Sequence, residues 1–144
     1  MEKKHFIKDL KKTLKTCKMN KLKYFPEDIN IIKTYKNENR IMEILFNSKY
    51  SSLILHIDRD FPKLCFVYNV VTDDNVLRKG HASWLLGYAE YYAQEVLKCD
   101  QITLEANRNS FCKSWYERLG YKTVMAYEDD ERVIMTKKLE EEYN

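Results

Sequence analysis

The stretch "VLRKGHASWLL", residues 76–86, joins an apolar run to a helical pattern and contains Gly80, one of only three glycines in the chain. The apolar run ends near Val71, and a helix is predicted to begin after Gly80. The first turn of a helix carries amide groups without helical partners and a partial positive charge. A glycine at that point permits a positive φ and leaves no Cβ in the way of a ligand. The junction therefore indicates either an ordinary turn or a cradle for a phosphate group.

The residues around Gly80 suit the second interpretation. Arg78 and Lys79 add positive charge, Ala82 is small, and Ser83 offers a hydroxyl group. His81 either helps to neutralise a phosphate or faces solvent as an ordinary helix residue. The glycine spacings of the P-loop and of the dinucleotide-binding fingerprint are both missing, so neither motif explains the junction.

Three β-rich runs precede the junction, at residues 40–48, 52–58 and 64–71. The connections between them are short, which favours antiparallel neighbours and predicts a three-stranded meander. The third run is apolar on both faces apart from Tyr68 and Asn69. We therefore expect it to be a central, fully buried strand.

A helix and a further strand follow the junction. Residues 80–97 carry an apolar stripe at helical spacing, and residues 100–107 alternate between apolar and polar positions. The stripe consists of Leu85, Ala89, Tyr92 and Val96. A strand, a helix and a strand in this order predict a right-handed crossover between parallel neighbours. Ligands of such sheets lie outside the carboxyl ends of the strands.

The remaining patterns complete one layered sheet. Residues 110–121 predict a short helix with Phe111 and Trp115 inward and Gly120 as a left-handed C-cap. Two final strands surround the "EDDE" turn at 128–131 and form a hairpin.

Three elements are predicted before the meander. These are an amphipathic helix over 4–18, a short strand at 21–25 and a second helix that begins at Pro26. The whole order predicts an α/β (α+β) architecture built on one sheet.

Length and cysteine usage limit the class of protein. A chain of 144 residues indicates one domain, without an apolar run long enough to cross a membrane and without a signal-peptide core. We therefore expect a cytoplasmic protein with no membrane partner. The four cysteines are far apart and read as reduced, mostly buried thiols, with no metal site: Cys17, Cys65, Cys99 and Cys112.

The positive charge is concentrated at the N-terminus. Residues 1–24 contain nine lysines and two acidic residues, whereas the rest of the chain has a net charge of −4. Such a segment either docks nucleic acid or an acidic protein, or is the solvated face of a helix. We favour the solvated face and do not expect nucleic acid as a partner.

The loop "LRKGHA" resembles that of GNAT-type N-acetyltransferases, whose pattern is Arg/Gln-x-x-Gly-x-Gly/Ala. Gly80 and Ala82 match its last two positions. Leu77 stands where Arg or Gln is usual, and Arg78 supplies a positive charge one place later.

A second stretch, "ITLEANRNSFCKSWYERLGYK", also resembles this family. Asn109, Tyr116, Leu119, Gly120 and Tyr121 occupy the positions of its strand–Asn–Tyr–LGF pattern, and "VIMTKKL" is typical of its last strand. The resemblance covers about residues 40–139. It implies a mixed sheet with an antiparallel meander, a central splayed pair of parallel strands and helices on both faces. It also implies one domain over 1–144, with a basic helix at 1–20.

The resemblance further implies an activity and a cofactor. Acetyl-CoA would donate its acetyl group to a primary amine of a small molecule or protein, by direct attack through a tetrahedral intermediate. Tyr116 is the implied acid and Glu105 the candidate base. His56, Asp73, Asp74 and a relayed water are weaker candidates for the base. The implied cofactor-binding residues are Val70, Val71, Thr72, Arg78, Lys79, Gly80, His81, Ala82, Ser83, Asn109 and Tyr116.

Two points stay open at this level. A homodimer is an expectation from the family rather than from the residues. The strand that precedes the loop carries no carboxylate and Leu77 departs from the pattern, so a catalytically silent CoA-binding or interaction module is the alternative function.

Overall fold

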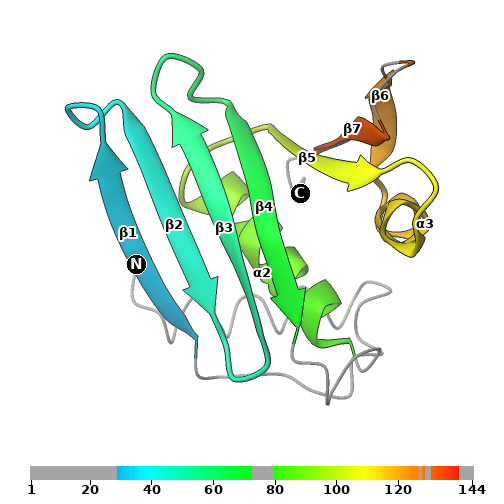
Figure 1. The fold of residues 1–144 in the computed structure, drawn as a ribbon. Coiled ribbons are helices and arrows are strands. Elements are labelled where there is room, and N and C mark those ends of the chain that lie inside the picture. The colour runs from blue at the N-terminus through cyan, green and yellow to red at the C-terminus, as the bar shows by residue number, and fades with distance from the viewer. Residues whose placement is uncertain (1–28, 73–79, 127, 129–130, 140–144) are drawn as a thin grey trace, which may run out of the picture.

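The computed structural model describes residues 29–72, 80–126, 128 and 131–139. In this part of the chain seven strands form one mixed sheet in the order β1-β2-β3-β4-β5-β7-β6, with two helices (Figure 1). The elements are β1 (Asn30–Lys36), β2 (Ile41–Asn47), β3 (Ser51–Asp58), β4 (Leu64–Thr72), α2 (His81–Glu95), β5 (Gln101–Asn107), α3 (Phe111–Arg118), β6 (Lys122–Ala126) and β7 (Arg132–Lys138). The helix and the short strand predicted within residues 4–25 lie outside the described residues.

The predicted meander is confirmed. Strands β2, β3 and β4 are antiparallel neighbours, with Ile44 opposite Leu55 and Leu55 opposite Val67. These side chains point toward α2, which lies behind this half of the sheet (Figure 1). Alternate residues of each strand therefore form one wall of the hydrophobic core.

The helix predicted to begin at Pro26 is wrong for the residues that the structure describes. Residues 30–36 form β1, which pairs with β2 along its whole length. Ile31 lies opposite Phe46 and packs against the core, so pairing with the sheet outweighs the helix-start signal of the preceding residues.

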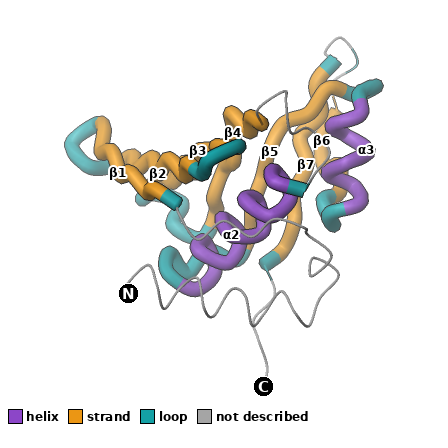
Figure 2. Tube along the Cα trace, turned by 90° about the horizontal axis from the view of Figure 1, so that it is seen from below, coloured by secondary structure: helices purple, strands orange, loops and turns teal. Residues whose placement is uncertain are grey.

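The parallel pair is confirmed, and the two strands separate. β4 and β5 pair only at Leu64, Cys65 and Phe66, although β4 continues to Thr72. Asn69 has a φ of 56°, and the register between β3 and β4 shifts after Ser52, so β4 bends at this level. The splayed central strands that the family resemblance implies are therefore present. Helix α2 packs against β3 and β4, and α3 packs against β5 (Figure 2).

β4 is central, as predicted, but the prediction that it is fully buried is wrong, because β5 separates from it. Val71 is 58% exposed and Phe66 is also exposed. Beyond Phe66, β5 no longer pairs with this edge of β4, so part of the strand lies open.

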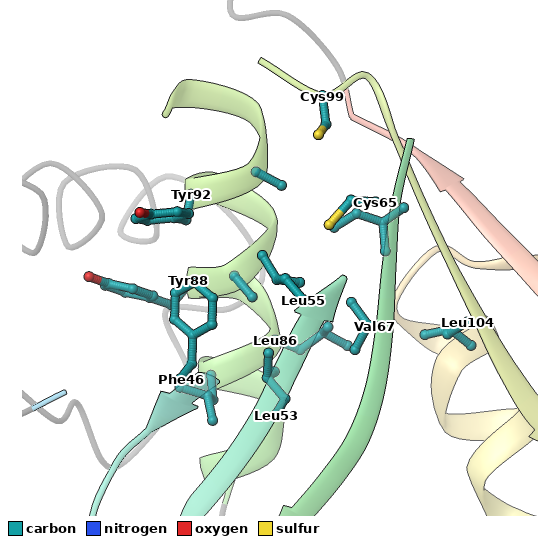
Figure 3. Close-up of a cluster of buried hydrophobic side chains, with 14 of the residues drawn as sticks. Phe46, Leu53, Leu55, Cys65, Val67, Leu86, Tyr88, Tyr92, Cys99 and Leu104 are labelled. Atoms are coloured by element: carbon teal, nitrogen blue, oxygen red, sulfur yellow. The ribbon is translucent and has the colours of Figure 1, made fainter. Parts of the chain in front are cut away.

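Helix α2 supplies the other wall of the core. Its predicted stripe is confirmed, because Leu85, Ala89 and Tyr92 are buried and Val96 packs against the core. In Figure 3 the ring of Phe46 lies close to Tyr88 and Tyr92 of this helix. Both ring pairs have edge-to-face geometry, with centroids 5.8 and 5.2 Å apart.

Helix α3 buries a different face from the predicted one. Phe111 is 62% exposed, and its ring lies 5.5 Å from the guanidinium of Arg118. Tyr116 is the buried residue of this helix, and Trp115 is partly buried. The predicted inward position of Phe111 is therefore wrong, and Tyr116 is the residue of α3 that is buried. Gly120 ends the helix region with a φ of 101°, as predicted.

A serine cap holds the start of α3. Ser110 Oγ accepts a hydrogen bond from the amide of Lys113 at 3.2 Å. We expect Ser110→Ala to lower the free energy of unfolding by about 1 kcal/mol, because the amide loses its cap. Ser114→Ala, an exposed serine in the same helix, is the control and should change stability little. Denaturant unfolding measures both, and equal stabilities would contradict the cap.

Candidate functional site

A cleft of about 740 Å³ opens where β4 and β5 separate. It is lined by residues of five strands and of α3. The lining residues are Glu43, His56, Phe66, Val67, Tyr68, Asn69, Val70, Leu104, Glu105, Ala106, Asn107, Cys112, Tyr116 and Arg132.

The cleft is bounded by side chains from both faces of the sheet. Val67 and Leu104 belong to the core on the α2 side. Tyr68 and Glu105 follow them in β4 and β5 and therefore point to the opposite face. A ligand in the cleft can thus be contacted from both sides, which suits a reaction between two molecules.

Tyr116 stands on the wall of the cleft and is only 7% exposed. Burial, with a smaller contribution from Cys112, raises the pKa of Tyr116 to about 12, above the ordinary value near 10. The phenol is therefore protonated at physiological pH and is held as a hydrogen-bond donor.

A polar cluster supports the ring of Tyr116. Its centroid lies 5.7 Å from that of Tyr121, whose hydroxyl donates to Glu90 of α2 at 2.9 Å. Lys137 Nζ donates to the other Glu90 oxygen at 2.8 Å. Burial next to Glu90 also keeps the pKa of Tyr121 well above its ordinary value, so its hydroxyl remains a donor. This cluster ties α2, β7 and the segment after α3 together.

The start of α2 has the geometry predicted for Gly80. This residue has a φ of 89°, in the left-handed region, and its carbonyl accepts the first helical hydrogen bond from Trp84. The amides of Ala82 and Ser83 precede that bond, so they have no acceptor within the helix. The Ser83 hydroxyl accepts a hydrogen bond from Trp115 Nε1 at 3.1 Å, which links the start of α2 to α3. Arg78 and Lys79 lie outside the described residues, as do Asp73 and Asp74.

The interpretation of His81 as a solvent-facing residue is wrong. It is 5% exposed, and its ring lies 4.7 Å from that of Tyr50. Ser51 Oγ donates to the His81 carbonyl at 3.4 Å. The β2–β3 turn region thus packs against the first residue of α2, and the imidazole is buried there.

The other predicted cofactor residues divide into two groups. Val70 lines the cleft, whereas Val71 and Thr72 lie at the end of β4, opposite Ser52 and Ser51 of β3. The structure does not bring Asn109 to the cleft lining: it is an exposed turn residue, and Asn107 lines the cleft instead.

Glu105 lies in the cleft lining, as a base for the acceptor would need to. Its Oε2 accepts a hydrogen bond from Arg132 Nη1 at 3.4 Å, and both side chains are more than half exposed. An exposed pair of this kind contributes little to stability.

Sequence reasoning missed Glu43, Cys112 and Arg132 and gave His56 little weight. All four line the cleft. His56 and Glu43 stand directly opposite each other on neighbouring strands, so only the strand register could have brought them together.

Three general findings complete the description of the described residues. Neither helix in the described residues is long and apolar enough to cross a membrane. Within the part of the chain that the structure covers, no three potential metal-ligating side chains cluster together. The described cysteines are free: Cys65 and Cys99 are buried, and Cys112 is exposed.

No protein-family model and no curated protein matches the sequence. Solved structures match the fold in large number, and many of them are GNAT-family acetyltransferases of low sequence identity. One is a GNAT family acetyltransferase from Elizabethkingia anophelis with acetyl-CoA bound, with a TM-score of 0.57 and 12% identity over 77% of this chain and 98% of that one.

Two other matches acetylate defined substrates. The ribosomal-protein-S18-alanine N-acetyltransferase of Escherichia coli has a TM-score of 0.53 and 17% identity, over 75% of this chain and 74% of that one. The spermidine/spermine N-acetyltransferase SpeG of Vibrio cholerae has a TM-score of 0.55 and 14% identity, over 72% of this chain and 68% of that one. The chain therefore has the GNAT fold, with one parallel pair in an otherwise antiparallel sheet.

Proposed function

We propose that this protein is a single-domain N-acetyltransferase that transfers the acetyl group of acetyl-CoA to a primary amine of a small molecule or protein. The observation that carries this proposal is the cleft between β4 and β5, which is lined by Tyr116 and ionisable side chains. The fold supports it, because neighbours with the same fold include acetyltransferases with coenzyme A or acetyl-CoA bound. The free cysteines suit a reducing compartment, so we place the protein in the cytoplasm.

The residues present fit this cofactor. Main-chain amides at the start of α2 are donors for a pyrophosphate, and Gly80 in its left-handed conformation shapes their approach. Val70, Val71 and Thr72 end β4 on the edge that β5 has left, so their backbone groups would bind the pantetheine arm. We assign the pyrophosphate to residues 78–83, where Arg78 and Lys79 would add charge.

Bound in this way, acetyl-CoA would supply an activated acetyl group as a thioester. Tyr116 would donate a hydrogen bond to the departing sulfur from the α3 wall. A side chain on the face of the sheet opposite α2 would take the proton of the acceptor amine. Glu105, which the sequence analysis proposed as the base, lines the cleft on that face. The site thus separates the acid and the base across the cleft.

Acetyl-CoA should raise the melting temperature by roughly 5–10 °C at 100 times its Kd, because it binds only the folded state. A DNA duplex and a mixed RNA should give no shift. Stabilisation by nucleic acid without stabilisation by acetyl-CoA would contradict the proposal.

The same protein should release free thiol from acetyl-CoA in the presence of a suitable amine. The panel contains spermidine, an aminoglycoside and a peptide with an N-terminal alanine, which are amine classes that proteins of this fold acetylate. Binding of acetyl-CoA without thiol release for any amine would favour the silent CoA-binding module over the enzyme.

A further inference from the structure

A line of polar side chains crosses four neighbouring strands on the face of the sheet opposite α2. Lys36 Nζ of β1 lies 2.6 Å from Glu43 Oε1 of β2. The other oxygen of Glu43 lies 3.2 Å from His56 Nδ1 of β3. The Tyr68 hydroxyl of β4 lies 3.5 Å from the same nitrogen. The line therefore runs from the edge strand to the centre of the sheet.

The line ends at the cleft. Glu43, His56 and Tyr68 all line it. His56 is directly opposite Phe66, and Phe66 is the last β4 residue that pairs with β5. The imidazole therefore stands beside the point where the two parallel strands separate.

The carboxylate of Glu43 fixes the state of the imidazole. Its hydrogen bond with Lys36 is the main reason that the pKa of Glu43 lies below its ordinary value, so the group stays ionised. An ionised carboxylate can only accept, and therefore His56 Nδ1 carries the proton of the 3.2 Å hydrogen bond. In the neutral ring the other nitrogen, Nε2, then has the lone pair that a general base needs.

A purely structural role would explain why Glu43 and His56 pair, but not why the pair lies at the cleft. Cross-strand charged pairs stabilise a sheet by about 0.2–1 kcal/mol wherever they occur. The Glu43–His56 pair contacts the cleft and contains an oriented imidazole, and both side chains are partly buried there. Glu105, by contrast, is engaged by Arg132 and is more exposed. Imidazole groups ordinarily titrate close to neutral pH, whereas carboxyl groups ordinarily do so about two units lower.

We propose that His56, rather than Glu105, is the general base of the reaction, and that Glu43 is a positioning residue that orients its ring. The inference rests on the proposed function. His56 Nε2 takes a proton from the acceptor ammonium, directly or through one water. The freed nitrogen lone pair forms the C–N bond to the acetyl carbon, and the C–S bond breaks. Tyr116 gives its proton to the leaving thiolate and is reprotonated by the second nitrogen proton, and His56 returns its proton to solvent.

Three variants separate the candidates: His56→Gln, Glu43→Gln and Glu105→Gln. With the best amine of the panel, His56→Gln should lower kcat/KM by about 100-fold and remove the acid limb of the pH profile. Its Kd for acetyl-CoA should stay within about twofold of the parent value, because the ring lies away from the start of α2. Glu105→Gln should keep the acid limb and lose less than about fivefold in kcat/KM.

Glu43→Gln tests the positioning role. The charged and titratable groups that face His56 are Glu43 with Lys36 on the β1 side, Asp58 on its own strand and Tyr68 on β4. Loss of the Glu43 charge leaves the imidazolium with less stabilisation. The acid limb should therefore move to lower pH, a change that a merely structural role would not produce.

A second measurement does not depend on turnover. Nitrogen-15 NMR of the imidazole in the protein without cofactor should show the Nδ1–H tautomer for the parent and a mixture for Glu43→Gln. An unprotonated Nδ1 in the parent, or an active His56→Gln with the parent pH profile, would overturn the assignment of His56. A parent that binds acetyl-CoA but acetylates no amine would instead overturn the proposed function, and this inference with it.

Discussion

Tyr116→Phe is expected to lower kcat about 100-fold while the Kd for acetyl-CoA stays within about twofold of the parent value. The substitution removes one hydroxyl group from the wall of the cleft and keeps the ring that packs against Tyr121. A donor that acts on the departing sulfur matters in the transition state and little in the ground state. The thiol-release assay gives kcat, and the acetyl-CoA melting shift gives the affinity.

Tyr92→Phe is the matched control. Tyr92 and Tyr116 are both 7% exposed, and Tyr92 lies in the core beside Phe46, outside the cleft lining. Removing its hydroxyl should therefore affect stability alone. Equal turnover in Tyr116→Phe and the parent would show that the phenol is not the acid.

The pH dependence of this loss follows from burial. Burial raises the pKa of Tyr116 to about 12. The phenol therefore keeps its proton below that pH, and it would lose the proton only as the pH rises through about 12. The ratio of parent to variant rates should be constant from about pH 6 to about pH 10, since the Tyr116 donor is present throughout. A ratio that falls between those values would mean that another group supplies the proton.

The central pair of strands could be predicted because its signals are local. The apolar run of β4, the stripe of α2 and the alternation of β5 each follow from a few neighbouring residues. Short and long connections then decide between antiparallel and parallel pairing. The left-handed Gly80 and Gly120 follow in the same way, because few other residues adopt a positive φ without strain.

The elements that the sequence did not predict depend on distant partners. The sequence before and within β1 predicts a helix, and the pairing with β2 is what makes this segment a strand. The face that α3 buries depends on contacts with residues far away in the chain. One of them is the hydrogen bond from Trp115 to Ser83 of α2. Local patterns carry no information on such contacts.

The candidate site also contains residues that local patterns cannot bring together. Tyr116 and Gly80 stand in motif positions and could be named from the sequence. Glu43 and His56 are 13 residues apart on two strands, and they meet only because the β2–β3 register places them opposite each other. A one-residue slip would send both side chains to other neighbours.

Gly80→Val should weaken acetyl-CoA binding by about 10- to 100-fold, by a path that differs from that of Tyr116→Phe. A β-branched residue at a φ of 89° is strained, by roughly 1–3 kcal/mol. The backbone will relieve that strain by rotating Gly80, which displaces the amides of Ala82 and Ser83 from the positions where they would meet a pyrophosphate. Every tenfold loss of affinity corresponds to about 1.4 kcal/mol, so part of the strain suffices for the lower figure. Isothermal titration with acetyl-CoA measures the change.

Strain alone could lower the stability of any variant, so the control must carry the same strain elsewhere. Gly120 also has a left-handed φ, and a Cβ there would lie 3.4 Å from Lys137 Cε. Gly120→Ala and Gly80→Ala should therefore lose similar stability, but only Gly80→Ala should bind acetyl-CoA more weakly. If Gly80→Val folds and binds as tightly as the parent, the amides that begin α2 do not hold the cofactor. The cofactor would then have to enter the cleft from the other face of the sheet, where Glu43, His56 and Tyr68 lie.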